Sequence, residues 1–359
     1  MRESMLFMGL LLLACTGGNA TDTPDAGSAV SAIRLSGEWD RTCFIDARGA
    51  LFCWGAADGA TPVRVVEGTW REVAATVGFT CAIRSEGTLW CWGQNLVGDG
   101  TTLPRRLPIP VGTTQDWAHV ATGPGHSCAI RNDGTLWCWF GDEWTGWVPS
   151  PDFQITPIQV GVERDWVQVS NHFYRTCGVR AQGTLWCWEA DDSGIMKAPV
   201  QVGTDQDWMR IAVGALHQCA VRRDGTLWCW GVNASGELGL GTATEKVSAP
   251  AQVGTADWNG VAIGYHHTCA LREDGGLWCW GQGRSGEIDG VHSSDKTNPI
   301  PVPLGEPAGW SAVTAGVGHS CVARGQDEVW CWGQNTSGEL GLGTIDEVVH
   351  PPTLLFFDE

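Results

Sequence analysis

The sequence lacks several features that would place it in common functional classes. Its one extended apolar run, Leu6–Ala14, is too short to cross a bilayer as a helix, which needs about 20 residues. It has no Cys-x2-Cys cluster, which argues against structural zinc. Basic residues are few, with 22 Lys and Arg against 40 Asp and Glu. The net charge of −18 opposes binding to nucleic acid and to anionic membranes.

Signals of catalysis are also missing. We find no Gly-rich phosphate loop opening a helix, no Ser nucleophile elbow and no spacing of metal ligands. We therefore expect no catalytic residue, no metal, no cofactor and no enzymatic activity. Four histidines stand two residues before a cysteine and could form a ring, for which we favour a structural role over a metal or catalytic one: His126, His217, His267 and His319.

Cysteine, by contrast, is abundant and regularly spaced. Fourteen of the 15 cysteines fall into seven pairs with nine residues between the members. The pairs are Cys43 with Cys53, Cys81 with Cys91, Cys128 with Cys138, Cys177 with Cys187, Cys219 with Cys229, Cys269 with Cys279 and Cys321 with Cys331. One spacing repeated seven times indicates seven copies of one unit, each closed by its own disulfide. Such bonds form in oxidising compartments, which predicts export.

The residues between paired cysteines predict a β-hairpin. In the second copy, Gly87 lies at the turn, where a left-handed backbone costs glycine little. Pairing Arg84 with Thr88 leaves a three-residue loop and places Cys81 opposite Cys91 in a non-hydrogen-bonded pair, which suits a disulfide. Arginine recurs near this turn in six copies, and we interpret these residues as solvated charges: Arg84, Arg131, Arg180, Arg222, Arg272 and Arg324.

Tryptophan follows the same register. Nineteen of the 22 Trp lie beside a second cysteine or eleven residues before a first one, which indicates packing between repeats rather than sugar binding. Each unit offers about four short strands, and both faces of its hairpin are apolar, so both must be covered. Units of roughly fifty residues with these properties indicate radial stacking. We predict an all-β fold, a seven-bladed β-propeller of four-stranded antiparallel blades.

The fullest copies of the repeat point to a known family. Trp230–Gly239 reads WGVNASGELG and Trp332–Gly341 reads WGQNTSGELG. This pattern resembles the regulator of chromosome condensation repeat, over about residues 31–359, and the resemblance implies a seven-bladed β-propeller. Copies three and four depart from it after their second cysteine, so we expect remodelled outer loops there. We also expect the tail Pro352–Phe357 to pair into the first blade and close the ring.

The N-terminus resembles a bacterial lipoprotein signal, in which cleavage precedes Cys15 and its thiol takes a lipid. An ordinary secretory peptide with an incidental cysteine is the alternative. We expect a monomer, lipid-anchored to the cell envelope on its periplasmic or cell-surface side, that touches the membrane only through Cys15. The expected parts are a signal peptide (1–14), a flexible tether (15–30) and the propeller (31–359), with repeats near 31–70, 71–117, 118–166, 167–208, 209–258, 259–310 and 311–359.

One loop varies while the rest of the repeat is constant. It lies four to two residues before each first cysteine and contains both tyrosines of the chain. Equivalent loops of a propeller emerge at one end, so their large side chains would form a patch for a protein partner of basic character. The patch residues are Trp39, Phe79, Phe173, Tyr174, Leu216 and Tyr265. The alternative is that these side chains only fill the loop interior.

Two hypotheses about function follow. The first is a protein-binding scaffold or inhibitor that uses this loop face, with an unidentified partner. The second is a carbohydrate- or small-ligand-binding module, or an enzyme, that uses the channel mouth or the loop containing Trp144 and Trp147.

Overall fold

The computed structural model describes residues 34–56, 58–94, 97–140, 155–189, 197–293, 297–305, 309–325 and 327–357. The predicted signal peptide, Cys15, the tether and the loop containing Trp144 and Trp147 lie outside these ranges. The described residues belong to one compact unit, Ala32–Glu359. They form 28 β-strands, and no helix among them is long and apolar enough to cross a membrane.

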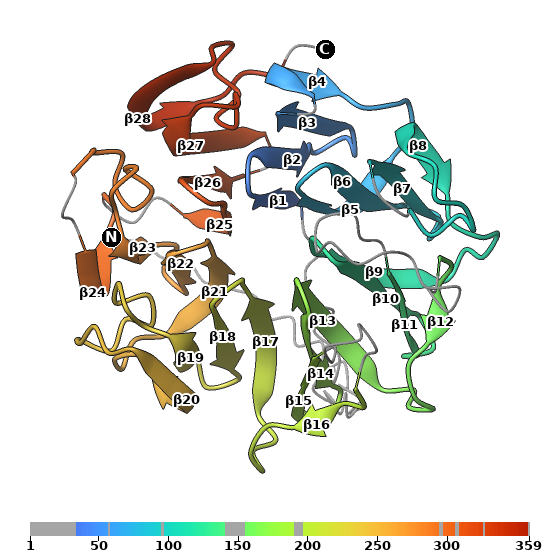
Figure 1. Ribbon diagram of the computed structural model, residues 1–359, viewed down its shortest axis with the longest axis horizontal. Helices are drawn as coiled ribbons and strands as arrows, with labels where there is room; N and C mark the ends of the chain where they lie inside the picture. Colours follow the sequence, from blue (N-terminus) through green and yellow to red (C-terminus); the bar gives the residue numbers. More distant parts are fainter. Residues whose placement is uncertain are drawn as a thin grey trace, which may run out of the picture. The chain divides into compact units, whose positions relative to one another are not determined.

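The strands group in chain order into seven four-stranded antiparallel sheets, so the predicted seven-bladed propeller is confirmed (Figure 1). Blade 1 contains β1 (Leu35–Glu38), β2 (Arg41–Ile45), β3 (Leu51–Gly55) and β4 (Gly59–Arg64). Blade 2 contains β5 (Trp70–Thr76), β6 (Phe79–Arg84), β7 (Leu89–Gly93) and β8 (Arg105–Pro110). Blade 3 contains β9 (Trp117–Thr122), β10 (His126–Arg131), β11 (Leu136–Phe140) and β12 (Ile158–Gln159). Blades 4 and 5 contain β13 (Trp166–His172), β14 (Arg175–Arg180), β15 (Leu185–Glu189), β16 (Val200–Gln201); and β17 (Trp208–Val213), β18 (His217–Arg222), β19 (Leu227–Val232), β20 (Lys246–Gln252). Blades 6 and 7 contain β21 (Trp258–Ile263), β22 (His267–Arg272), β23 (Leu277–Gln282), β24 (Thr297–Pro303); and β25 (Trp310–Ala315), β26 (His319–Arg324), β27 (Glu328–Asn335), β28 (Asp346–Leu354).

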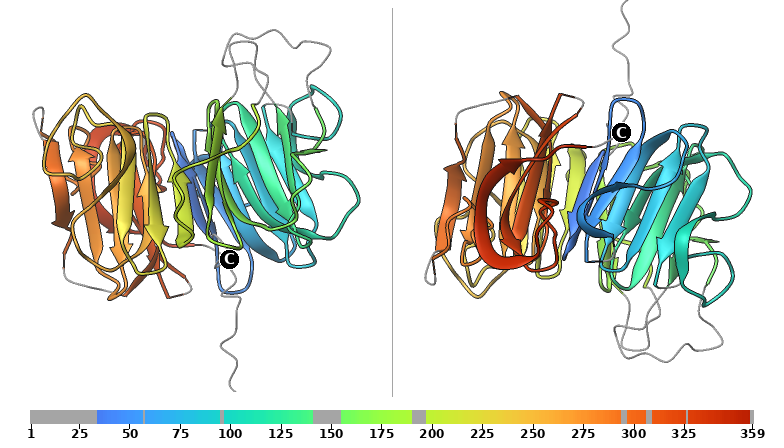
Figure 2. Two further views of the ribbon diagram at one scale, coloured as in Figure 1. Left: turned by 90° about the horizontal axis from the view of Figure 1, so that it is seen from below. Right: turned by 90° about the horizontal axis from the view of Figure 1, so that it is seen from above.

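The first strand of every blade faces the axis. These inner strands contact one another in sequence, and β1 contacts both β5 and β25, which closes the ring. The edge-on views in Figure 2 show the blades side by side around this axis. Within an antiparallel blade, the loop after the first strand and the loop after the third strand emerge at the same end. The hairpin turn after the second strand emerges at the opposite end.

The predicted cross-links are present in all seven blades. In each blade the two cysteines are directly opposite in register, with Cα atoms 4.1 Å apart, and their sulfur atoms form a disulfide within the blade. In blade order, Cys43 is bonded to Cys53, Cys81 to Cys91, Cys128 to Cys138, Cys177 to Cys187, Cys219 to Cys229, Cys269 to Cys279 and Cys321 to Cys331. These are the pairs that the constant spacing predicts, and none of them joins two blades.

The predicted hairpin between the cysteines is confirmed in detail. In blade 2 the Arg84 N–H donates to Thr88 O at 3.0 Å, and Gly87 has a φ of 88°. Trp90 pairs with Ala82, so a large side chain faces a small one across the hairpin. The left-handed backbone at Gly87 therefore fixes the turn, and the turn sets the strand register that places the two cysteines opposite each other.

The interpretation of the repeated arginines as solvated charges is wrong. The Arg84 guanidinium lies 4.9 Å from the ring centre of Trp70 and 4.1 Å from that of Trp90. The same stacking between two tryptophans recurs at Arg131, Arg180, Arg222 and Arg272, and Arg324 stacks on Trp310. Each contact of this kind contributes about 0.5–1 kcal/mol. The charge therefore lies over the aromatic rings of its own blade and covers them.

The predicted closure by strand exchange is also wrong. Blade 1 is completed by its own β4, and β28 pairs with β27 of its own blade. The tail instead reaches blade 1 through side chains. Leu355 is buried between blades 7 and 1, and the Phe357 ring lies 5.2 Å from Phe44 and from Phe52. The tail is thus joined to blade 1 by hydrophobic packing and not by hydrogen-bonded strands.

Candidate protein-binding face

The loops between the first two strands of each blade form one end of the propeller, which we call the loop face. It comprises residues 39–40, 77–78, 123–125, 173–174, 214–216, 264–266 and 316–318. The recurring histidines lie directly beneath it, at the start of the second strands. Each contacts the hydroxyl that precedes the first cysteine of the next blade, at 2.5–3.0 Å. The pairs are His126 with Thr176, His217 with Thr268, His267 with Ser320 and His319 with Thr42.

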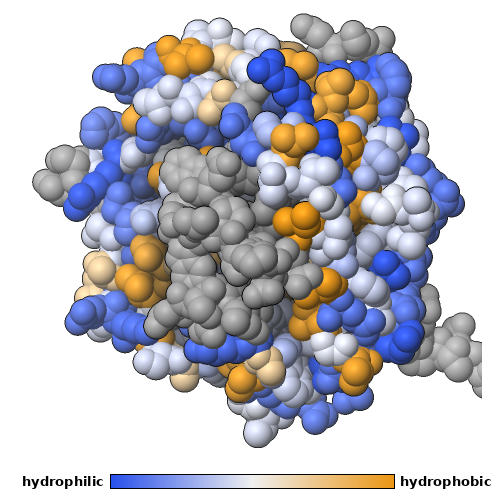
Figure 3. All heavy atoms as spheres, turned by 45° about the vertical axis from the view of Figure 1, so that its right-hand side comes forward, coloured by the Kyte–Doolittle hydropathy of each residue, from blue (hydrophilic) through white to orange (hydrophobic). Residues whose placement is uncertain are grey.

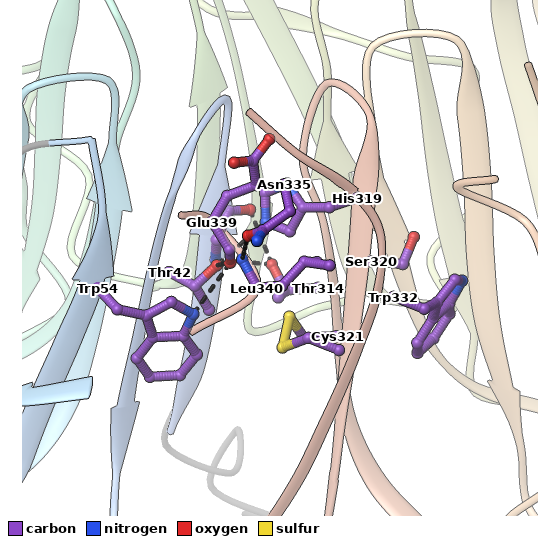
Figure 4. The surroundings of a disulfide bond; sticks show 12 residues. Thr42, Trp54, Thr314, His319, Ser320, Cys321, Trp332, Asn335, Glu339 and Leu340 are labelled. Carbon is purple, nitrogen blue, oxygen red and sulfur yellow. Dashed lines mark hydrogen bonds between the residues drawn. A yellow bond between two sulfur atoms is a disulfide. The ribbon is translucent and has the colours of Figure 1, made fainter. Parts of the chain in front are cut away.

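The Gly-Glu-Leu loop that follows the third strand continues this link between blades (Figure 4). At the junction of blades 7 and 1, Glu339 O accepts from Trp54 Nε1 at 2.9 Å and from Thr42 Oγ1 at 3.4 Å. Asn335 Oδ1 accepts from Leu340 N at 3.2 Å and so fixes the loop. Equivalent bonds join blade 5 to 6 through Glu237 O and blade 6 to 7 through Glu287 O.

Blades 3 and 4 receive no such bond from the described residues of their neighbours. Blade 2 has Gly98-Asp99-Gly100 in place of the Gly-Glu-Leu motif, and copy three departs from the motif after Trp139. The Nε1 atoms of Trp139 and Trp188 consequently have no hydrogen-bond partner within the described ranges. The fourth strands β12 and β16 are only two residues long, in line with the departure of these copies from the repeat.

The histidines beneath the loop face are neutral at physiological pH. Burial lowers the pKa of His126, His217 and His319 to about 4 and that of His267 to about 3. The neutral rings act as hydrogen-bonding links between blades, in agreement with the structural role that we favoured from the sequence. In the described part of the chain, no group of His, Cys, Asp and Glu is arranged to hold a metal ion.

Large side chains of the loop face meet above the axis. The Trp39 ring of blade 1 lies 6.3 Å from Phe173 of blade 4 and 6.2 Å from Tyr265 of blade 6. Blades 1 and 4 are not neighbours in the ring, so this contact spans the channel mouth. Glu38 Oε1 and His172 Nε2 also meet across it, at 2.6 Å. The repeat symmetry therefore brings these side chains together, as expected.

Their exposure differs. Tyr174 is 40% exposed and stacks on Phe173, while Trp39, Phe173, Leu216 and Tyr265 are half-buried. Phe79 is 5% exposed and packs in the core between blades 2 and 3, so its predicted place in an exposed patch is wrong. It occupies the position of the buried histidines, two residues before the cysteine, and points inward as they do.

Two of these aromatic residues have a strained backbone. Trp39 has a φ of 56° and Phe173 a φ of 44°, the only positive values at non-glycine residues among those described. A left-handed conformation costs a residue with a large side chain about 1 kcal/mol or more, and such strain gathers at functional sites. The sequence contained no signal for this strain, nor for the contact between Glu38 and His172.

Acidic groups surround the aromatic cluster. Burial, with a smaller contribution from the charge of Asp40, raises the pKa of Glu339, and burial raises that of Glu287 to about 7. Burial alone would raise the pKa of Glu237, but hydrogen bonds from His266 and from backbone N–H groups lower it. The nearby cation Arg175 is already paired with Glu189. The three glutamates with shifted pKa values are buried, so the acidic side chains nearer the surface of the cluster are the half-buried Glu38 and Asp40.

Comparison with known protein families decides the relationship. The model described as "Regulator of chromosome condensation (RCC1) repeat" matches residues 70–99, 117–139, 210–237, 259–287 and 310–339. A second model of the same description matches residues 224–271 and 326–359. Together these matches span half of the chain. The chain belongs to the RCC1 repeat family. No curated protein sequence matches it.

Solved structures show the same fold in other RCC1-like propellers. Yeast RCC1 (Prp20) bound to Kap60 superposes with a TM-score of 0.75 at 18% identity, covering 97% of this chain and 91% of that one. Human WBSCR16 has a TM-score of 0.68 at 19% identity, covering 83% and 85%. Saccharomyces cerevisiae Prp20p, described with its binding to Gsp1p and histones, has a TM-score of 0.67 at 18% identity, covering 79% and 80%. At these identities the likeness shows the shared fold, an RCC1-like propeller.

Proposed function

We propose that this RCC1-repeat protein is a scaffold or inhibitor of the cell envelope that binds a protein partner through its loop face. The aromatic cluster formed by Trp39, Phe173, Tyr174 and Tyr265 carries the proposal. Tyrosine and tryptophan supply a large contact area with few rotatable bonds, and they dominate the energetics of protein interfaces. The strained backbone at Trp39 and Phe173 supports a functional reason for this arrangement.

The rest of the surface offers less for such contact. On the side shown in Figure 3, apolar side chains occur in small groups among hydrophilic ones. The exposed apolar residues of the outer strands, such as Leu107 and Val63, are interspersed with arginine and proline, which protect sheet edges from pairing. The loop face is where aromatic rings from several blades meet.

The partner should be basic. The chain carries a net charge of −18, and two half-buried carboxylates border the aromatic cluster: Glu38 and Asp40. An acidic rim around an aromatic centre selects a basic surface and speeds its approach, so association should slow as salt rises. A lipid on Cys15 would hold the propeller at the membrane through the tether.

The binding test compares variants of the full-length chain that carry Cys15→Ser to keep them soluble. Immobilised protein is incubated with envelope extract, and the retained partner is identified and then titrated in purified form. Tyr174→Ala combined with Tyr265→Ala should raise the dissociation constant about 30-fold, the effect of losing one interface hot spot. The matched control is Leu107→Ala, which removes an exposed apolar side chain from an outer strand.

The outcome is clear in either direction. Loss of binding in the tyrosine variant, with an unchanged melting temperature and normal binding by the Leu107→Ala control, supports the loop face. Equal binding by the tyrosine variant and the wild type contradicts it. An association rate that is insensitive to salt contradicts the basic character of the partner while leaving the face itself in place.

A further inference from the structure

A second feature of the central channel lies away from the loop face, in the first half of the inner strands. Seven residues occupy equivalent positions there. Each lies opposite the residue on the second strand of its blade that comes two positions after the first cysteine. In ring order from blade 1 they are Arg34, Glu72, His119, Gln168, Arg210, Gly260 and Ala312.

Three of these residues bond the next inner strand. Glu72 Oε1 accepts from Val120 N at 2.9 Å, His119 contacts Val169 O at 2.9 Å, and Gln168 bonds both Ile211 N and Ile211 O. These bonds show that the backbone N–H at this level points toward the channel, away from the second strand. At Val120 and Ile211, a side chain of the preceding blade accepts from this N–H group.

The other half of the ring has no such acceptors at the equivalent positions. Arg210 can only donate, and Gly260 has no side chain, so neither can accept from the equivalent N–H groups of Val261 and Val313. The space beside Gly260 is also open. A Cβ atom added at Gly260 would meet only Leu271 Cβ, at 4.0 Å, and Ala312 beside it is small.

Arg210 is half-buried and occupies the equivalent position in the blade before Gly260, and no ion pair joins it to another described residue. Its Nε is buried and has no hydrogen-bond partner in that part of the chain, and burial lowers its pKa. A desolvated guanidinium is costly unless it is paired, because its charge has lost water without gaining an anion. Outward-pointing backbone N–H groups beside a guanidinium are the usual composition of an anion site.

We propose that this recess, formed by Arg210, Gly260, Ala312 and the N–H groups of Val261 and Val313, binds a small oxyanion. Inorganic phosphate or sulfate and the carboxylate of an organic acid share this chemistry. Arg210 supplies charge and the backbone supplies the fixed donors. Arg34, which follows Ala312 in ring order, is exposed and adds positive charge at the same level of the inner strands. The binding is independent of the loop face and of the partner proposed for it.

Two variants test the site from opposite directions. Arg210→Gln removes the charge and should weaken anion binding about tenfold to a hundredfold, the contribution of hydrogen bonds to a charged group. Gly260→Glu places a carboxylate in the recess, where it can accept from Val313 N as Glu72 accepts from Val120 N. It should raise the melting temperature in anion-free buffer and abolish the response to added anion. Arg106→Gln, an exposed arginine on the outer strand β8, is the control.

The measurement is thermal unfolding of the full-length, oxidised protein with phosphate, sulfate or acetate, each compared with chloride at equal ionic strength. Titration calorimetry with phosphate gives the dissociation constant. We expect stabilisation of the wild type and of Arg106→Gln beyond that in chloride. A response to phosphate and sulfate alone identifies a tetrahedral inorganic anion as the ligand, and a response to acetate identifies a carboxylate. No stabilisation beyond chloride overturns the proposal, as does an undiminished response in Gly260→Glu, which decides the matter even if Arg210→Gln fails to fold.

Discussion

Acid should destabilise this propeller through the histidines beneath its loop face. In the folded protein, burial holds the pKa of three of them at about 4 and of His267 at about 3, whereas an unfolded histidine titrates near about 6.5. Between these values the unfolded chain binds protons that the folded chain does not. The free energy of unfolding therefore falls as pH falls from about 6.5 to about 4.

The size of the effect follows from the same values. Between about pH 7.5 and pH 5, each histidine removes about 2 kcal/mol from the free energy of unfolding. The four together would remove about 8 kcal/mol. Glu287 opposes them, because burial raises its pKa to about 7 and the folded state then keeps a proton that the unfolded state loses; it returns about 2 kcal/mol. Asp40 and Glu339, whose pKa values burial raises, oppose the loss in the same way, as does His119, whose pKa the charge of Glu72 raises against the effect of burial. We expect the four histidines to outweigh these groups, so the net loss is a few kcal/mol, a large part of the stability of many domains.

The assay is chemical denaturation of the oxidised protein at about pH 7.5 and about pH 5. His217→Gln removes one titrating ring while its amide can still bond Thr268, so this variant should lose about 2 kcal/mol less than the wild type over the same interval. His292→Gln, which alters an exposed histidine, should behave as the wild type. An equal pH dependence in His217→Gln and wild type would refute the reasoning that buried, neutral histidines link the blades.

Three further predictions concern the cross-links, the seam and the anchor. Replacing Cys81 and Cys91 together by serine should lower the free energy of unfolding by about 3 kcal/mol, the loop-closure value for about eleven residues, and peptide mapping without reductant should find no disulfide between blades. Phe357→Ala should cost about 1–3 kcal/mol, because its ring packs against three aromatic residues of blade 1; the 79% exposed Phe356 is the control, and equal melting temperatures of the two variants would show that the tail does not close the ring. Cys15→Ser should abolish incorporation of a fatty-acid analogue, and labelling equal to wild type would exclude Cys15 as the lipidation site.

Periodic features of the fold could be predicted because they repeat. The spacing of the cysteines determined the hairpin register, and Gly87 with its equivalents located the turns. Because the repeat occurs seven times, departures from it in single copies did not obscure the pattern. The blade number and the strand order were therefore predictable. The recurring arginines repeat just as regularly, but their stacking on Trp70 and its equivalents was missed, because these tryptophans lie on a different strand from the arginines.

Features that occur once were harder to predict. Phe357 lies at the opposite end of the chain from blade 1, which it contacts. Its position is not part of the repeat, so the sequence pattern does not predict this contact. Phe79 belongs to the variable loop by position, yet it takes the inward-facing place of a histidine. The oxyanion recess arises because Arg210, Gly260 and Ala312 happen to occupy neighbouring blades, a three-dimensional adjacency between residues about fifty positions apart in the chain.

The completion of every blade by its own contiguous chain has a consequence for biosynthesis. Each disulfide joins cysteines ten positions apart, and no blade waits for a strand from elsewhere. A nascent chain could therefore oxidise and finish one blade before the next has emerged, and each correct cysteine partner would be the nearest one available. Only the final step, the packing of blade 7 and its tail against blade 1, requires the two ends to meet. The slow search for distant contacts that delays many β proteins is then confined to this one seam.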